Sequence, residues 1–216
     1  NGFDWNFDMT RSAEDNYGRQ PDTGTSKLAA AIDGRGGPGG NETFNLFDPS
    51  ANSQELRDWM RSDQETWTDV VLSVVDFVMS GEVGDVSLAV GAQQRREKYD
   101  ISRSENSIVE FDAAGNLSKP ADMIFLGGGT ESSASRTTNA VFVEASTDLS
   151  DNLELKGALR YEDLENDSNV DPKISLRYEA SDEVILRASV STSFREPSLS
   201  QLYTSGVGLQ GIQDYN

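Results

Sequence analysis

The sequence predicts an all-β chain that forms part of the wall of an antiparallel transmembrane β-barrel. Three observations predict this class: apolar and polar residues alternate, the alternating stretches are long enough to cross a bilayer, and the connections are long and short in turn. The alternation is clearest between residues 152 and 195, where three successive stretches each keep their charges on one face. The charged residues that follow this rule are Glu154, Lys156, Arg160, Glu162, Lys173, Arg177, Glu179, Arg187 and Arg195.

The lengths and connections of the predicted strands separate a membrane barrel from a soluble sheet. The strands are about 10–13 residues long, close to the roughly 9–11 residues that cross a bilayer at a tilt and longer than typical globular strands. Long segments at about 11–66, 100–138 and 196–216 alternate with tight turns, as external loops and periplasmic turns do in such barrels. We therefore predict about seven strands, at residues 1–10, 67–79, 86–99, 139–149, 152–164, 171–180 and 183–195.

The first long loop, about 11–66, contains one predicted helix. The glycine-rich run at 33–40 excludes regular structure. Residues 53–61 have the pattern of a short helix, because Ser53 can cap its N-terminus and Leu56, Trp59 and Met60 fall on one face.

Composition excludes several classes of function. The 216 residues contain 18 Lys and Arg against 37 Asp and Glu, for a net charge of −19, and they contain no His and no Cys. Ser-His-Asp and Cys-His catalytic sites, His- or Cys-ligated zinc and haem, and disulfides are therefore impossible within this chain. Nucleic-acid binding, which needs clustered cations, is disfavoured. We expect no enzyme activity and no cofactor.

Several ordered motifs carry a family resemblance. Residues 193–203, SFREPSLSQLY, are similar to an element written GFRAPSLSELY in the β-barrel part of TonB-dependent outer-membrane receptors, with Glu196 where Ala is usual. Residues 142–145, 152–155 and 160–163 resemble a hairpin of that family, and residues 171–178 resemble one of its strands. The residues that match the first motif are Phe194, Arg195, Pro197, Ser198, Leu199, Leu202 and Tyr203.

The resemblance implies a fold and a function. It implies a barrel of about 22 strands plugged by an N-terminal domain, of which this chain holds a part of the wall, without the plug. It further implies a receptor in the outer membrane of a Gram-negative bacterium that imports a siderophore, cobalamin or an oligosaccharide with energy from the TonB complex. Its implied partners are outer-membrane lipid, the TonB complex through the missing plug, and the ligand. The alternative is a soluble acidic extracellular β-sandwich that acts as a binding module.

Two sets of residues are candidates for a site. Phe44, Phe47 and Trp59 could stack on a sugar or a flat ligand, although a small core internal to the loop is the favoured interpretation. The second set has oxygen ligands at alternate positions, as a calcium loop does: Asp163, Glu165, Asp167 and Asn169. Because Ser168 and Ile174 stand where an EF-hand needs Gly and Glu, a solvated external loop is favoured there.

The adjacent Arg95 and Arg96 bear on where the membrane ends. Neighbouring residues of a strand point to opposite faces, so one of the two arginines faces outward. A lipid-facing Arg at the bilayer midplane costs about 2–4 kcal/mol. We therefore place residues 95–99 outside the hydrocarbon.

Overall fold

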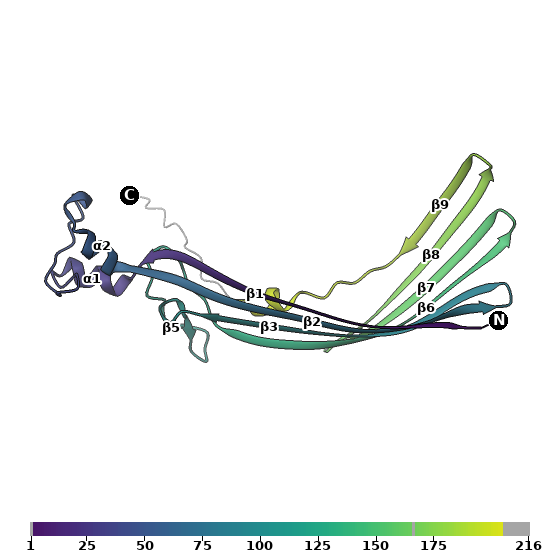
Figure 1. Ribbon diagram of the computed structural model, residues 1–216, viewed down its shortest axis with the longest axis horizontal. Coiled ribbons are helices and arrows are strands. Elements are labelled where there is room, and N and C mark those ends of the chain that lie inside the picture. Colours follow the sequence, from purple (N-terminus) through teal and green to yellow (C-terminus); the bar gives the residue numbers. More distant parts are fainter. Residues whose placement is uncertain (1, 166, 205–216) are drawn as a thin grey trace. The chain divides into compact units, whose positions relative to one another are not determined.

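The computed structural model describes residues 2–165 and 167–204 and shows an antiparallel all-β chain (Figure 1). One seven-stranded sheet has the order β1-β2-β3-β6-β7-β8-β9, so neighbours in the sheet follow each other along the chain apart from the insertion of a small β4-β5 sheet. The strands of the main sheet are β1 (Asp4–Thr23), β2 (Arg61–Val83), β3 (Val86–Arg103), β6 (Ser132–Ser150), β7 (Leu153–Asp163), β8 (Ser168–Ser181) and β9 (Val184–Ser191). The predicted fold class and the seven strands are confirmed.

Short elements lie between the long strands. The small sheet consists of β4 (Glu110–Phe111) and β5 (Leu117–Lys119). The helices are α1 (Thr25–Ile32), α2 (Gln54–Met60) and α3 (Leu199–Tyr203), with 3-10 turns η1 (Pro49–Ala51) and η2 (Glu105–Ser107). None of the helices among the described residues is long and apolar enough to cross a membrane.

The structure corrects the bounds of the long connections. The first one runs over residues 24–60 instead of 11–66, and the second over 104–131 instead of 100–138, because the flanking strands continue further than the alternation predicts. These strand extensions consist mostly of polar residues, so they carry no regular apolar periodicity. At the other end, β9 stops at Ser191 instead of residue 195.

The helix predicted in the first connection is present, and a second one accompanies it. Ser53 caps α2 as expected: its Oγ accepts a hydrogen bond of 2.9 Å from the backbone N–H of Leu56. The alanine-rich α1 was not predicted. Together the two helices form a small core of Ala31, Leu56 and Met60.

The chain divides into two compact units. Unit 1 comprises Asn1–Ala13, Val70–Lys98 and Ser135–Ser198, and unit 2 comprises Glu14–Asp69, Tyr99–Ala134 and Leu199–Asn216.

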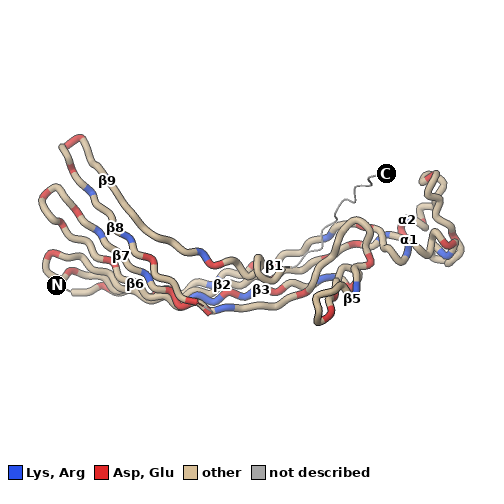
Figure 2. Tube along the Cα trace, turned by 180° about the vertical axis from the view of Figure 1, so that it is seen from behind, with Lys and Arg blue, Asp and Glu red and all other residues tan. Residues whose placement is uncertain are grey.

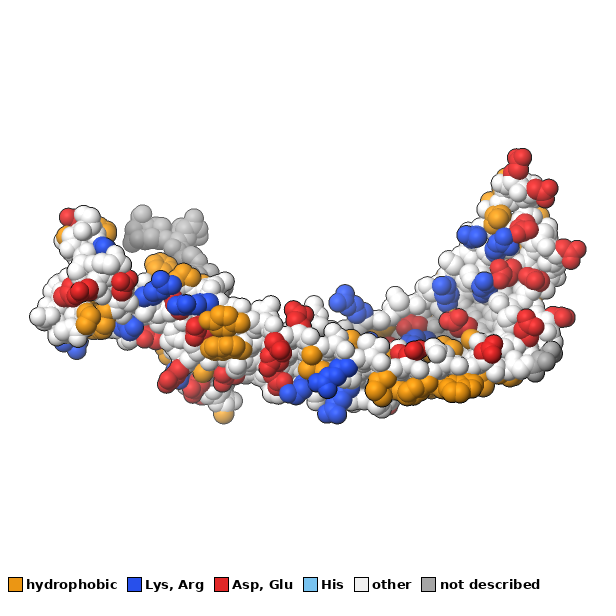
Figure 3. All heavy atoms as spheres, in the orientation of Figure 1, with side chains coloured by type: hydrophobic (Ala, Val, Ile, Leu, Met, Phe, Trp, Pro, Cys, Tyr) orange, Lys and Arg blue, Asp and Glu red, His pale blue; other side chains and the backbone are white. Residues whose placement is uncertain are grey.

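Unit 1 is a sheet with one apolar and one polar face. Cross-strand pairing keeps the alternation in step: Ala145 lies opposite Gly157, and Gly157 opposite Ile174. One side, here called the apolar face, exposes large hydrophobic side chains, some of which form a band along the lower edge of this unit in Figure 3. They include Trp5, Phe7, Phe77, Val141, Val143, Leu159, Tyr161, Ile174, Leu176, Tyr178, Leu186 and Val190.

The opposite side of unit 1, here called the polar face, carries the charges. Glu144, Lys156, Lys173 and Arg187 belong to it, and the sequence alternation predicts the last three. Acidic residues also mark the tight turns between consecutive strands (Figure 2). An apolar outer face with a polar inner face is the pattern of a membrane barrel wall.

Unit 2 is held together by the small helical core and by hydrogen bonds that fasten the second connection. Asp22 is only 7 % exposed. Its carboxylate accepts hydrogen bonds from the backbone N–H groups of Phe125 and Leu126, at 3.0 and 2.6 Å. Asp122 accepts two more from Ser26, from its N–H at 2.7 Å and its hydroxyl at 2.6 Å. These bonds fix the end of the second connection beside the start of α1.

Candidate functional site

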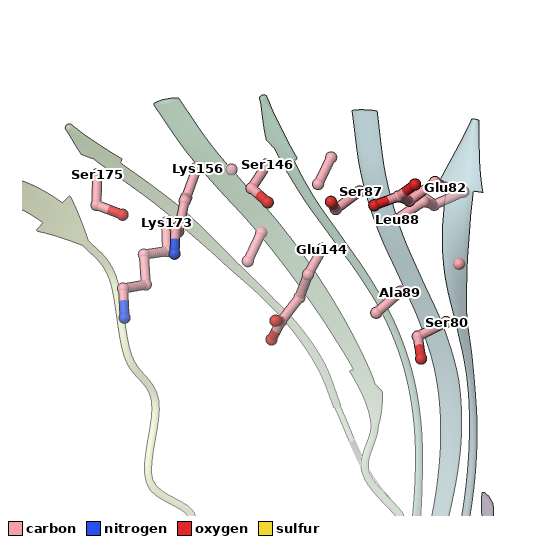
Figure 4. A pocket seen from close by; sticks show the side chains of 14 residues that line it. Ser80, Glu82, Ser87, Leu88, Ala89, Glu144, Ser146, Lys156, Lys173 and Ser175 are labelled. Atoms are coloured by element: carbon pink, nitrogen blue, oxygen red, sulfur yellow. The ribbon is translucent and has the colours of Figure 1, made fainter. Parts of the chain in front are cut away.

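The polar face of unit 1 contains a hollow of about 460 Å³ between β2 and β8 (Figure 4). Its shape follows from the pairing of the strands. Glu144 and Lys173 both lie opposite Ala158, whose methyl group leaves space between the two charged side chains. In the next row Lys156 lies between Ser146 and Ser175, which are also small.

The lining of this hollow offers both signs of charge and several hydroxyl groups. Its polar side chains are Ser80, Glu82, Ser87, Glu144, Ser146, Lys156, Lys173 and Ser175. Lys156 already has a partner, because its Nζ lies 2.9 Å from Glu154 Oε1. The residues are equipped to hydrogen-bond a polar surface or ligand, and they contain no nucleophile paired with a base.

A buried arginine organises another part of the polar face. Arg136 has 6 % of its side chain exposed and lies on β6. Its Nε donates a hydrogen bond to Glu97 on β3, and its Nη1 lies 3.1 Å from Glu196 Oε2. Nη1 also donates a hydrogen bond of 2.6 Å to the backbone oxygen of Pro197. Arg136 thus connects the segment after β9 to the sheet. One of its contacts there is Glu196, the residue that differs from the family motif.

The matched motif divides between the two units. In unit 1, Phe194 and Arg195 are exposed, and Ser198 is half-buried. In unit 2, α3 begins at Leu199, which packs on Tyr99 and Ile101. Leu202 and Tyr203 are exposed on the same helix.

The three candidate aromatic residues do not gather in one place. Phe44 and Trp59 are partly buried against the small core of α1 and α2, which is the favoured sequence interpretation. Lys27 Nζ lies 6.0 Å from the centre of the Trp59 ring. Phe47, in contrast, is 99 % exposed. Of the three, Phe47 has its whole ring accessible to a ligand, and ligand binding by all three stays a prediction.

The candidate calcium ligands lie around the β7-β8 connection. Asp163 ends β7, Glu165 and Asp167 are exposed, and Asn169 Nδ2 donates a hydrogen bond of 2.7 Å to Asp171 Oδ2. Across the described part of the chain, no three Asp or Glu side chains are grouped so that they could hold a metal ion. The calcium interpretation therefore stays a prediction.

Sequence reasoning missed Arg136, Glu144 and Asp22. The first two were within reach: extending the alternation of β6 backward from Phe142 places Arg136 on the same face as Glu144. Arg136 was missed because that strand was predicted to begin at residue 139. No sequence signal marks Asp22, whose role depends on residues about a hundred positions away.

Comparison with known proteins decides what this wall belongs to. The family model described as TonB dependent receptor-like, beta-barrel matches residues 1–216. The chain belongs to this family. No curated protein and no solved structure matches it.

Membership of the TonB-dependent receptor barrels settles several expectations. The family consists of outer-membrane receptors and transporters of Gram-negative bacteria, and not of enzymes. Membership of this family excludes the alternative that the chain is a soluble β-sandwich module. The apolar face of unit 1 is accordingly the face that meets lipid, and the polar face lines the interior of the barrel.

Proposed function

We propose that this receptor barrel imports a scarce nutrient, namely a siderophore, cobalamin or an oligosaccharide, with energy that the TonB complex delivers through a plug. The observation that carries the proposal is the family match along the whole chain, combined with a barrel wall whose polar face faces inward. A wall of this kind forms the boundary of a transport path and does not itself perform chemistry.

The polar face supports the plugged form of this barrel. The hollow between Glu144 and Lys173 presents exposed donors and acceptors that a plug surface can satisfy. Smaller hollows continue along β7, β8 and β9 and are lined by Lys156, Lys173, Arg177 and Arg187. We infer that the plug docks on this surface through hydrogen bonds and ion pairs.

The connections in unit 2 support the ligand-binding part of the proposal. They are the long connections of the chain, which in such barrels lie outside the cell. Phe47 is exposed on the first connection, which also contains the folded core of α1 and α2. A rigid loop with an exposed ring is suited to stacking on a sugar or an aromatic siderophore.

Uptake by cells that produce the full receptor tests the function. We expect one of three labelled ligands, a ferric siderophore, cobalamin or an oligosaccharide, to accumulate in cells with an intact TonB complex and not in cells that lack it. Accumulation that is independent of TonB would contradict active transport and indicate a passive channel.

A matched pair of variants tests the role of Phe47. Phe47→Ala should weaken ligand binding about tenfold, the order of the loss of one stacking contact. Leu46→Ala removes an exposed apolar side chain from the neighbouring position and serves as the control. If the two variants bind the ligand with equal affinity, Phe47 is not part of the binding site. The proposal of active transport would be unaffected by that result.

A further inference from the structure

The apolar face of unit 1 can be divided into rows of residues that lie side by side on neighbouring strands. Three contacts fix the register. A Cβ on Gly81 of β2 would meet the ring of Phe3, the residue before β1, at 2.7 Å. Asp76 on β2 accepts a hydrogen bond from Gln93 on β3, at 2.7 Å. Gln94 on β3 donates one of 2.9 Å to Asn139 on β6.

Counting along the antiparallel strands from these contacts locates one row of interest. Eight residues on from Phe3 and eight back from Gly81, Arg11 lies beside Ser73. Three residues back from Asp76 and three residues on from Gln93, Ser73 lies beside Arg96. The ring pair Tyr17–Trp67 keeps the same register further along β1 and β2. Arg11 and Arg96 therefore flank Ser73, two strands apart, at a Cα separation of about 10 Å.

This arginine row lies just past the end of the apolar band. The row before it is mixed and holds Met9, Gln94 and Asn139. The row before that one is apolar and includes Phe7, Phe77 and Val141. One row corresponds to about 7 Å along a strand, and the headgroup layer on each side of the hydrocarbon is about 5–7 Å thick. The guanidinium groups consequently reach the level of the lipid headgroups.

Both side chains are available to a ligand at that level. Arg11 and Arg96 are exposed. Neither has a hydrogen-bond or ion-pair partner within residues 2–165 and 167–204. The nearest carboxylate on the same face of unit 1 is that of Asp163, one row away and two strands from Arg96. That separation is about 12 Å, beyond the Debye length of about 8 Å.

We propose that Arg11 and Arg96 form a binding site for the phosphate groups of lipids in the outer leaflet. They lie at the end of the apolar band from which β1, β2 and β3 continue toward the long connections, which is the external side in such barrels. Two unpaired guanidinium groups next to a lipid-facing surface complement an anionic headgroup whose acyl chains cover that surface. The spacing suits either one phosphate approached from both sides or two phosphates of one headgroup.

Lipid binding to the full receptor in a neutral detergent tests this site. Native mass spectrometry would measure the affinity for phosphatidic acid, which carries a phosphate monoester, and for phosphatidylcholine, whose phosphate is covered by a quaternary ammonium. The double variant Arg11→Gln/Arg96→Gln should bind phosphatidic acid about thirtyfold more weakly, since each interfacial cation contributes on the order of a factor of five. Binding of phosphatidylcholine should change little.

A control removes the same amount of charge elsewhere. Arg35→Gln/Lys119→Gln takes away one exposed cation from each of the first two long connections, and its affinity for phosphatidic acid should match the wild type. An unchanged affinity of the Arg11/Arg96 variant, or an equal loss in the control, would overturn the site. Displacement of the lipid by millimolar inorganic phosphate would overturn it in favour of a free-phosphate site. Heat-modifiable migration of each variant verifies that its barrel is folded.

Discussion

Arg136 shows how a single charge can be buried in the polar face of this wall. Two carboxylates, from Glu97 and Glu196, and one backbone oxygen surround its guanidinium group. A buried cation is tolerated only when such partners replace its water. Glu196 stands where the resemblance leads one to expect Ala, so this receptor adds a second carboxylate to the arginine.

We predict that Arg136→Met destabilises the receptor by about 3 kcal/mol, because it leaves two carboxylates close together without their cation. The free energy of unfolding in urea, measured with the barrel in vesicles, would detect this loss. Glu196→Ala should cost less, since Glu97 still pairs with the arginine. A larger loss for Glu196→Ala than for Arg136→Met would contradict this account.

The environment of Asp112 makes the stability of the β4-β5 turn dependent on pH. Hydrogen bonds from the Asn116 side chain, and then from backbone N–H groups of the turn, hold the pKa of the Asp112 carboxyl below its usual value. Because folding lowers this pKa, the ionised carboxylate stabilises the turn. The stabilisation is complete above the pKa of the unfolded chain and is lost as the pH falls through the lowered pKa.

The turn should therefore lose protection of its amides in strong acid. Hydrogen exchange of residues 112–117 should rise, after correction for intrinsic rates, as the pH falls below the usual range of a carboxyl pKa. Asp112→Ala should raise the exchange already at neutral pH and abolish the dependence. Wild-type protection that stays constant over this range would refute the role of the carboxylate.

At the level of elements, α1 and α2 form a folded part of the first connection around Leu56. The side chain of Leu56 is fully buried with Ala31 and Met60. The backbone of Gly36 also approaches this core closely, since a Cβ there would lie 2.8 Å from Leu56 Cδ1. The glycine-rich run thus lets the chain pass over the core.

Substitutions in this core should loosen the connection without affecting the sheet. Leu56→Ala should destabilise the α1-α2 core by about 3 kcal/mol and Ser53→Ala, which removes the helix cap, by about 1 kcal/mol. Hydrogen exchange in residues 25–60 would report both losses. Phe47→Ala, whose ring makes no core contact, should leave the exchange unchanged.

The sequence predicts elements well where one face of a strand meets lipid. The alternation in β7 and β8 is sufficient by itself to place Lys156 and Lys173 on the polar face. The extension of β1 to Thr23 was missed because its stabilising contacts are polar and lie between strands, such as the hydrogen bond from Tyr17 to Glu65. The hollow in the polar face was equally beyond sequence reasoning, because it depends on which residue lies opposite Ala158.

At the scale of the whole molecule, the two faces of the wall should differ sharply in what they tolerate. Ile174→Arg places a cation near the middle of the apolar face and should cost about 3 kcal/mol in a bilayer. Ser175→Arg, one residue along β8, turns the same side chain into the polar hollow. The yield of folded, heat-modifiable receptor and its free energy of unfolding in urea should fall for Ile174→Arg and not for Ser175→Arg. Similar losses for both variants would contradict the assignment of the faces.

The alternation of the strands also has a consequence for the secretion of this protein. Polar residues interrupt the apolar ones along the strands and fill the connections, so the mean hydropathy of the chain is −0.54 although the finished wall is apolar on one side. A continuous apolar segment of about 20 residues would be retained in the first membrane that it met. Here the hydrophobic surface exists only once the strands have paired, which lets an unfolded chain traverse the inner membrane and become a membrane protein at its destination.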